Sequence, residues 1–138
     1  MMPMNDDVPV KKTPAPKWML VIADQPTLRD ILERFLQAAG HFVSTAADGL
    51  EGLDKARSLP IDLIVLDLDL TASGGFEVCA KLKSEAVTAD IPVLFISTRL
   101  TVLDLSKLAV AGGDGFLAMP FSLAEVRQTV NRLLGLQA

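Results

Sequence analysis

The chain has 138 residues, of which 50% are hydrophobic, and its 13 Lys and Arg residues against 17 Asp and Glu give a formal net charge of −4. This length predicts a single domain with a sizeable core, and the lack of a basic block argues against direct nucleic-acid binding by that domain. Cys79 is the only cysteine and His41 the only histidine, which excludes an internal disulfide, a multi-histidine metal site and a histidine-based catalytic cluster.

The N-terminal residues 1–16 combine prolines with polar side chains and lack an apolar stretch. We therefore expect a flexible extension there, with the domain itself over residues 17–138. Nowhere does the chain approach the roughly 20 apolar residues that span a bilayer. Together with the lone cysteine, which agrees with a reducing compartment, this predicts a cytoplasmic domain with no membrane partner.

The first half of the domain alternates short apolar runs with amphipathic stretches, a pattern that predicts strands separated by helices. The third strand is the clearest, because a continuous apolar run fits a parallel strand covered on both faces. His41 is assigned a surface position in the more polar second strand. The predicted elements are a strand at Trp18–Ile22, a helix with Pro26 in its first turn that stops at Gly40, a strand at His41–Ala46, a helix at Gly49–Ser58 and a strand at Leu63–Leu66 that ends at Asp67.

The second half repeats the alternation, with glycine and proline at the junctions. Ser122 and Glu125 have the spacing of a capping box, which marks the start of the last helix. The predicted elements are a helix opened by Gly74 and Gly75 with Phe76, Cys79 and Leu82 inward, a strand at Val93–Ile96 after Pro92, a helix near Val102–Ala111 ended by Gly112 and Gly113, a strand at Gly115–Ala118, and a last helix whose inner face carries Leu123, Val126, Val130, Leu133 and Leu134.

Polar side chains follow several of the predicted strands. Five strand–helix units in alternation favour a parallel sheet with helices on both faces, and sites in such sheets lie beyond the carboxyl ends of the strands. Asp24 follows the first strand, Asp67 and Asp69 follow the third, and Ser97 follows the fourth. Carboxylates that lie near one another repel unless a cation sits between them. Oxygen ligands favour a hard ion, and Mg²⁺ suits one that must also hold a phosphoryl oxygen.

Four segments around these strand ends resemble the receiver domains of response regulators, in the CheY-like superfamily. The resemblance covers about residues 17 to 135, and it rests on the order and spacing of the segments together. It implies a flavodoxin-like, doubly wound, five-stranded parallel sheet with strand order 2-1-3-4-5 and helices on both faces. The segments are Trp18–Asp24; Asp62–Leu70 with Gly75–Val78; Ile91–Ser97; and Gly112–Leu117 with Pro120–Phe121.

The resemblance also implies roles for individual residues. Asp67 corresponds to the aspartate that accepts a phosphoryl group from a phosphohistidine on a histidine kinase or a histidine phosphotransfer protein. Asp24 corresponds to a Mg²⁺ ligand, and Asp69 to the position whose main-chain carbonyl binds the same ion. Ser97 corresponds to the hydroxyl that hydrogen-bonds the phosphoryl group, and Phe116 to the aromatic residue that turns inward when that hydroxyl moves.

The chain departs from the family pattern at two positions of the site. Ala23 stands where the first residue of an acidic pair is usual, and Met119 stands where a lysine is usual. The losses have opposite charge and so offset each other electrostatically, but methionine donates no hydrogen bond. A lost charge-assisted hydrogen bond is worth roughly 1.5–3 kcal/mol. We hypothesise that Arg99 either pairs with Asp69 or reaches the phosphoryl group in place of the missing lysine.

Three functions remain open at this point. The first is a phosphorylatable switch without turnover, which presents the face carrying Val102–Ala111, Phe116 and Val126–Leu134 to a downstream protein partner. The second is a pseudo-receiver, a phosphorylation-independent interaction module, which Ala23 and Met119 motivate. The third is an aspartate-nucleophile phosphatase in which Asp67 attacks and Asp69 acts as general acid and base. A homodimer through the fourth and fifth helices stays open, as does the choice between a stand-alone regulator and a fragment.

Overall fold

Strands and helices alternate along the chain in the computed structural model, which describes residues 15–70, 74–97 and 102–136. Most of the predicted extension, residues 1–14, lies outside this range. The elements are β1 (Trp18–Ile22), α1 (Pro26–Ala38), β2 (Phe42–Ala46), α2 (Gly49–Ser58), β3 (Leu63–Asp67), α3 (Gly75–Ser84), β4 (Val93–Ser97), α4 (Val102–Ala111), β5 (Gly115–Ala118) and α5 (Leu123–Leu133).

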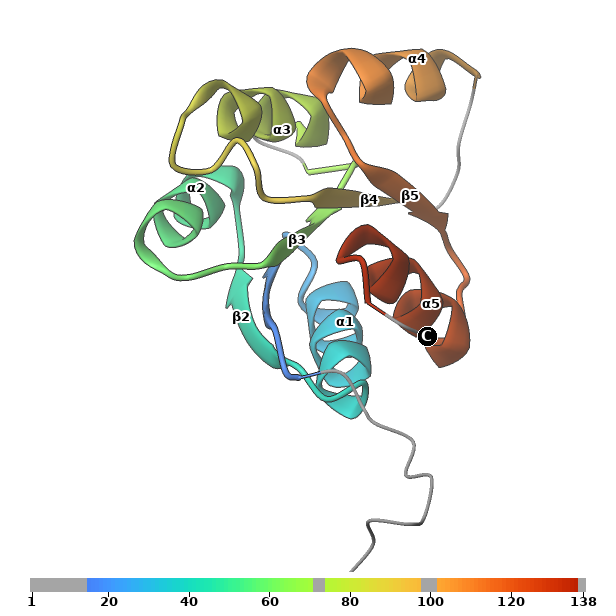
Figure 1. Ribbon diagram of the computed structural model, residues 1–138. Coiled ribbons are helices and arrows are strands. Elements are labelled where there is room, and N and C mark those ends of the chain that lie inside the picture. Colours follow the sequence, from blue (N-terminus) through green and yellow to red (C-terminus); the bar gives the residue numbers. More distant parts are fainter. Residues whose placement is uncertain (1–14, 71–73, 98–101, 137–138) are drawn as a thin grey trace, which may run out of the picture.

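The five strands form one parallel sheet in the order β2-β1-β3-β4-β5. This confirms the predicted doubly wound arrangement. Helices α1 and α5 cover one face of the sheet, and α2, α3 and α4 cover the other (Figure 1). All strands run in the same direction, so we call the edge where they begin the amino edge and the edge where they end the carboxyl edge.

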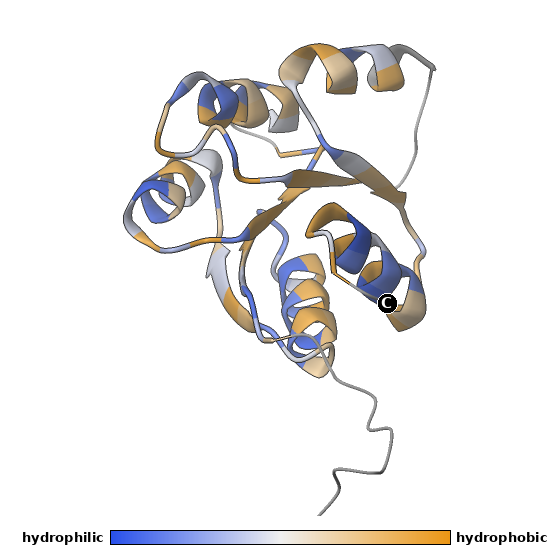
Figure 2. Cartoon of the chain, in the orientation of Figure 1, coloured by the Kyte–Doolittle hydropathy of each residue, from blue (hydrophilic) through white to orange (hydrophobic). Residues whose placement is uncertain are grey.

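The central strands are buried because helices pack on both of their faces. In β3, Leu63 and Val65 point into the core shared with α1 and α5, while Ile64 and Leu66 join the core shared with α2, α3 and α4. Figure 2 shows the resulting pattern of largely apolar strands between helices that carry both apolar and polar residues. This two-sided burial is the physical reason why β3 has a continuous apolar sequence.

Local signals place most of the helix ends as predicted. The capping box of α5 forms, with the Ser122 side chain accepting from the Glu125 N–H and the Glu125 carboxylate accepting from the Ser122 N–H. The surface position predicted for His41 is wrong: its side chain is buried, with 7% exposed. The imidazole Nδ1 accepts the Lys17 N–H at 3.1 Å, so the ring is satisfied at a buried position.

Within the described residues, no helix combines the length and the apolar character that crossing a bilayer requires.

Candidate functional site

The polar residues at the strand ends meet at the carboxyl edge. The ladder pairs Ile22 of β1 with Leu66 of β3, and Asp67 of β3 with Ile96 of β4, so the residues that follow these pairs lie side by side. Asp67 and Ser97 are buried, with 4% and 1% of their surfaces exposed. Asp24 is half-buried and Asp69 is exposed. The sheet therefore brings together the four residues that the sequence singled out.

Asp67 lies in an environment that disfavours its charge. Burial raises the pKa of the Asp67 carboxyl, and the nearby carboxylates of Asp69 and Asp24 raise it further. The Asp69 N–H donates to Asp67 Oδ1 at 2.9 Å and opposes this shift in the pKa. A buried carboxylate with two acidic neighbours is an arrangement that a cation or a proton would stabilise.

The Asp69 side chain contacts the hydroxyl at the end of β4. Ser97 Oγ donates to Asp69 Oδ2 at 3.3 Å. For the receiver-domain reading, sequence reasoning placed the main-chain carbonyl of Asp69 at the metal and paired its side chain with Arg99, but it missed this contact with Ser97. The available signal was a second aspartate two residues beyond a buried strand end, together with a hydroxyl at the end of the neighbouring strand.

Arg29 on α1 is a second residue that sequence reasoning missed. Its Nη1 donates to the carbonyl of Ala23 at 2.8 Å and, more weakly, to that of Asp24 at 3.4 Å. These contacts hold the turn between β1 and α1 from the side of the helix. No strand-end motif points to Arg29.

Gly75 lets α3 begin close to Asp67. A Cβ at this position would lie 2.7 Å from the carbonyl oxygen of Asp67 and 2.8 Å from the Cα of Leu68, so a side chain would collide with backbone. The Gly75 N–H donates to the Leu68 carbonyl at 3.3 Å. The glycine that the sequence marked as a helix start therefore also allows the close approach of the β3 end to α3.

The family model described as the response regulator receiver domain matches residues 19–131. The chain belongs to this family. Two regulators illustrate the likeness. RpaA of Synechocystis sp., named a DNA-binding dual master transcriptional regulator, is 38% identical over 116 residues, which cover 84% of this chain and 48% of RpaA. PrrA of Mycobacterium leprae, a transcriptional regulatory protein, is 39% identical over 116 residues, which cover 84% of this chain and 49% of PrrA. The receiver domain thus spans about half the length of these relatives.

Solved structures agree with the sheet topology. The chemotaxis protein CheY4 of Vibrio cholerae superposes with a TM-score of 0.83 and 29% identity, over 87% of this chain and 100% of that one. A receiver domain of the sensor histidine kinase PA1611 of Pseudomonas aeruginosa, with a magnesium ion coordinated in its active site cleft, shares the fold at a TM-score of 0.81 and 24% identity, over 88% of this chain and 99% of that one. Receiver domains are signalling domains, which favours signalling over the phosphatase alternative.

Ala23 and Met119, the two positions where we expect a departure from the family pattern, both lie at this carboxyl edge. Ala23 is fully buried, and its N–H donates to the Ala46 carbonyl at 3.1 Å. Met119 donates its N–H to the Ser97 carbonyl at 2.8 Å, and its half-buried side chain lines an apolar hollow. The other residues of that hollow come from α1 and from the segment before α5: Leu28, Ile31, Phe35, Pro120 and Phe121. Met119, where the resemblance predicts a lysine, is therefore part of an apolar surface in this receiver domain.

The structure does not test two of the roles predicted from the sequence, those of Arg99 and Phe116. Arg99 and the neighbouring Thr98 lie outside the described residues, so the predicted contacts of Arg99 stay predictions. Phe116 lies opposite Phe95 in the β4–β5 ladder, and its half-buried side chain packs against the core on the α2, α3 and α4 side. Its role as a switch is likewise still a prediction.

The residues of the site fit a hard divalent cation. Among the described residues, no three His, Cys, Asp or Glu side chains form a metal-binding group. The predicted ligand set needs only two carboxylates, from Asp24 and Asp67, with the third donor from the Asp69 main chain. All these donors are oxygens, as Mg²⁺ prefers. Burial is the main cause that raises the pKa of the Asp67 carboxyl, and the carboxylates of Asp69 and Asp24 add to it.

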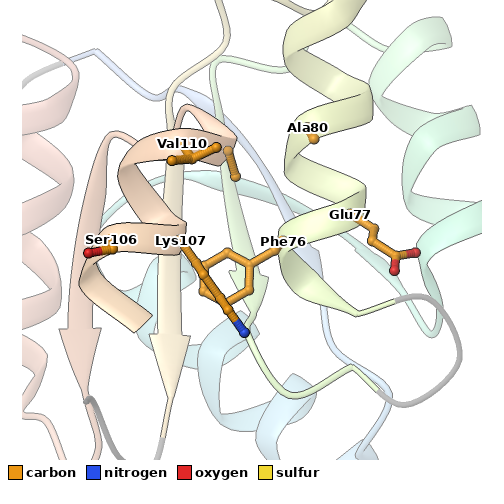
Figure 3. Close-up of a pocket in the computed structure, with 7 residues that line it drawn as sticks. Phe76, Glu77, Ala80, Ser106, Lys107 and Val110 are labelled. Atoms are coloured by element: carbon orange, nitrogen blue, oxygen red, sulfur yellow. The ribbon is translucent and has the colours of Figure 1, made fainter. Parts of the chain in front are cut away.

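A separate apolar groove lies between α3 and α4 (Figure 3). Phe76 and Ala80 line it from α3, and Lys107 and Val110 line it from α4. The Phe76 ring packs on Phe95, with ring centroids 5.4 Å apart. None of the acidic strand-end residues lines this groove, so it is not part of the candidate site.

Proposed function

We propose that this receiver domain is a phosphorylation switch, not a turnover enzyme, and that Asp67 is its phosphoryl acceptor. The observation that carries the proposal is the buried Asp67 carboxylate at the end of the central strand, beside the Asp24 and Asp69 carboxylates and the Ser97 hydroxyl. We assign residues 17–138 to the domain and residues 1–16 to an extension.

The proposed chemistry is a single transfer. A carboxylate oxygen of Asp67 attacks the phosphorus of a phosphohistidine, an acyl phosphate bond forms, and the bond between phosphorus and the histidine nitrogen breaks. Ser97 then donates its hydroxyl to a phosphoryl oxygen. Movement of Ser97 toward the phosphoryl group leaves space into which Phe116 turns, which biases the packing of α4 and β5.

We infer that Mg²⁺ is the cofactor, held by the carboxylates of Asp24 and Asp67 and by the Asp69 carbonyl. When bound, the ion offsets negative charge on the phosphoryl group and on the carboxylates. The oxygen-only donors and the acidic neighbours of the buried Asp67 carboxyl support this assignment. The PA1611 receiver domain, which shares the fold, carries a magnesium ion in its active site cleft.

The proposed partners are proteins. Response regulators interact with histidine kinases, and we propose a histidine kinase or histidine phosphotransfer protein as the phosphoryl donor. A downstream protein would bind the face formed by α4, β5 and α5, which is also the face for a homodimer. RpaA is named DNA-binding, but the net charge of −4 here favours protein partners over direct nucleic-acid contact. We propose a cytoplasmic location for this domain.

The decisive experiment is phosphotransfer to purified protein, with wild type and Asp67→Asn compared in the presence and absence of Mg²⁺. Acetyl phosphate and a panel of phosphorylated histidine kinases serve as donors, and intact-mass spectrometry detects the product. We expect Mg²⁺-dependent modification of wild type and none of Asp67→Asn. If no donor modifies the wild type, or if Asp67→Asn is modified equally, the proposal is wrong.

A pseudo-receiver is the second candidate, and the apolar surroundings of Met119 are the observation that favours it. Calorimetric titration with Mg²⁺ separates the two candidates. A receptive site binds the ion at millimolar concentration, and Asp24→Asn weakens that binding. A constitutive module gives no binding heat in either protein and keeps its cellular output in Asp67→Asn.

Arg99 provides a further test of how the site functions without the family's lysine. We propose that Arg99 pairs with Asp69 or contacts the phosphoryl group. Arg99→Ala should then change the rates of phosphorylation and dephosphorylation, and unchanged rates would remove this role.

A further inference from the structure

Asp69 contacts two of the groups that the proposed transfer needs. Its N–H donates to Asp67 Oδ1 at 2.9 Å, and its Oδ2 accepts the Ser97 hydroxyl at 3.3 Å. We propose that the Asp69 carboxylate is a brake on phosphorylation, because it engages the Ser97 hydroxyl and opposes the negative phosphoryl group. This inference rests on the proposed function, and it assigns to the side chain of Asp69 a role separate from that of its carbonyl.

The first part of the brake is competition for one proton. A serine hydroxyl has a single proton to donate. In the structure that proton is directed to Asp69, whereas the phosphorylated state needs it on a phosphoryl oxygen. Ser97 is 1% exposed, so water cannot readily replace Asp69 as the acceptor of its hydroxyl. Phosphorylation must therefore break the contact between Ser97 and Asp69.

The second part is charge. A phosphoryl group on a side chain carries about −1.5 to −2 charges near neutral pH. Asp69 lies close to both groups of the proposed transfer, since its N–H donates to Asp67 Oδ1 at 2.9 Å and its Oδ2 lies 3.3 Å from Ser97 Oγ. Asp69 is exposed, so solvent screens its repulsion of the phosphoryl group without removing it. Added negative charge at Asp67 then meets like charge from Asp69.

Two substitutions separate these parts, and both keep the Asp69 N–H and carbonyl. Asp69→Asn removes the charge but keeps an oxygen that can accept from Ser97, whereas Asp69→Ala removes both. The exposed Asp90 lies just before β4, at the amino edge. Asp90→Asn is therefore the matched control, since it changes the net charge of the chain equally without touching the site.

The measurement is the affinity for beryllofluoride, a stable analogue of the phosphoryl group, by calorimetry at saturating Mg²⁺. Saturation keeps a change in metal affinity out of the comparison. From the free energy of one hydrogen bond we expect Asp69→Ala to bind about two- to tenfold more tightly than wild type. Asp69→Asn should lie between the two, and Asp90→Asn should match wild type.

A double-mutant cycle with Ser97→Ala tests the mechanism. If Asp69 acts through the Ser97 hydroxyl, Asp69→Ala should improve the affinity for beryllofluoride less in the Ser97→Ala background than in the wild type. In that background, Asp69→Ala and Asp69→Asn should improve the affinity equally, because only the charge is left to remove. Equal affinity of wild type and Asp69→Ala, or weaker binding by Asp69→Ala, overturns the brake while leaving the proposed function standing. If neither the wild type nor any variant binds the analogue or accepts a phosphoryl group, the result counts against the brake and against the proposed function.

Discussion

The two edges of the sheet differ in how their charged groups interact. At the amino edge, the Lys83 ammonium donates to the carbonyls of Ala89 and Ile91 and to Asp114 Oδ2, at 3.2, 2.8 and 2.9 Å. Asp114 Oδ2 also accepts the N–H of Val93 at 2.8 Å. At the carboxyl edge, by contrast, acidic residues gather, and the pKa of the Asp67 carboxyl is raised by burial and by its acidic neighbours.

The charged groups at the amino edge stabilise the folded state, whereas those at the carboxyl edge destabilise it. Opposite charges with satisfied hydrogen bonds stabilise the junction of α3, β4 and β5. Like charges at the other edge destabilise the folded state until a ligand offsets them. Functional sites commonly trade stability for activity in this way. Removing the charge of Lys83 at the amino edge should therefore lower the free energy of unfolding, and removing the charge of Asp67 at the carboxyl edge should raise it.

The largest expected effect is at the amino edge. Lys83→Met removes three hydrogen bonds from a charged donor and leaves Asp114 without its cation, so we expect a loss of about 2–3 kcal/mol in the free energy of unfolding. Urea denaturation measures it, with Lys81→Met on the exposed side of α3 as the control that should lose less than about 1 kcal/mol. A similar loss in both variants would remove the special role of the Lys83 cluster.

Gly75→Ala should have the second largest effect. We expect a loss of about 1–2 kcal/mol in the free energy of unfolding, because the new Cβ collides with backbone atoms of Asp67 and Leu68. The collision also displaces the end of β3, so Mg²⁺ affinity should fall with stability. Gly115→Ala is the control, since its Cβ would meet the flexible end of the Leu133 side chain, away from the carboxyl edge. If Gly115→Ala impairs Mg²⁺ binding as much as Gly75→Ala, the close approach at Gly75 is not what matters.

The sequence was sufficient for those features that depend on neighbours along the chain. The continuous apolar run of β3, the glycines after α4 and the capping box at Ser122 are local signals, and the structure agrees with each of them. The gathering of Asp24, Asp67 and Ser97 followed from one topological rule about parallel strands. Periodicity alone did not provide the strand order, which came from the family resemblance.

Side-chain contacts across the fold could not be predicted in this way. The hydrogen bond between Ser97 and Asp69 joins residues 28 positions apart, and the one between Lys17 and His41 joins residues 24 positions apart. Arg29 lies near the start of a helix whose sequence pattern reports only its apolar face. Such contacts depend on the distance between elements, which a single sequence does not encode in a recognisable spacing.

At the carboxyl edge, Asp67→Asn should be more stable than wild type by about 1 kcal/mol at neutral pH. The folded state holds the pKa of the Asp67 carboxyl above its ordinary 3.8, so ionisation favours the unfolded chain as the pH rises past that value. The advantage of Asp67→Asn should therefore be present at pH 7 and vanish below about pH 4. Saturating Mg²⁺ should raise the stability of the wild type more than that of Asp67→Asn, and equal gains would contradict the metal assignment.

The smallest expected effect concerns His41, which lies next to the amino edge. Like Asp67, it is buried in surroundings that disfavour the charged form of its side chain. Burial lowers the pKa of the imidazole, Lys17 lowers it further, and Asp62 partly opposes this. The unfolded chain therefore binds a proton more readily than the folded one, so stability is lost as the pH falls below the ordinary value of 6.5. His41→Gln can still accept the Lys17 N–H but does not titrate.

Because His41 is the only histidine in the chain, the difference between wild type and His41→Gln isolates its titration. Urea denaturation at pH 7.5 and 5.5 should show a larger fall in unfolding free energy for the wild type, by less than the change expected at Asp67. Parallel falls in both proteins would mean that the folded state accepts a charged His41. In that case the amino edge would stabilise every charge that it contains, and the contrast with the carboxyl edge would be sharper than the structure alone implies.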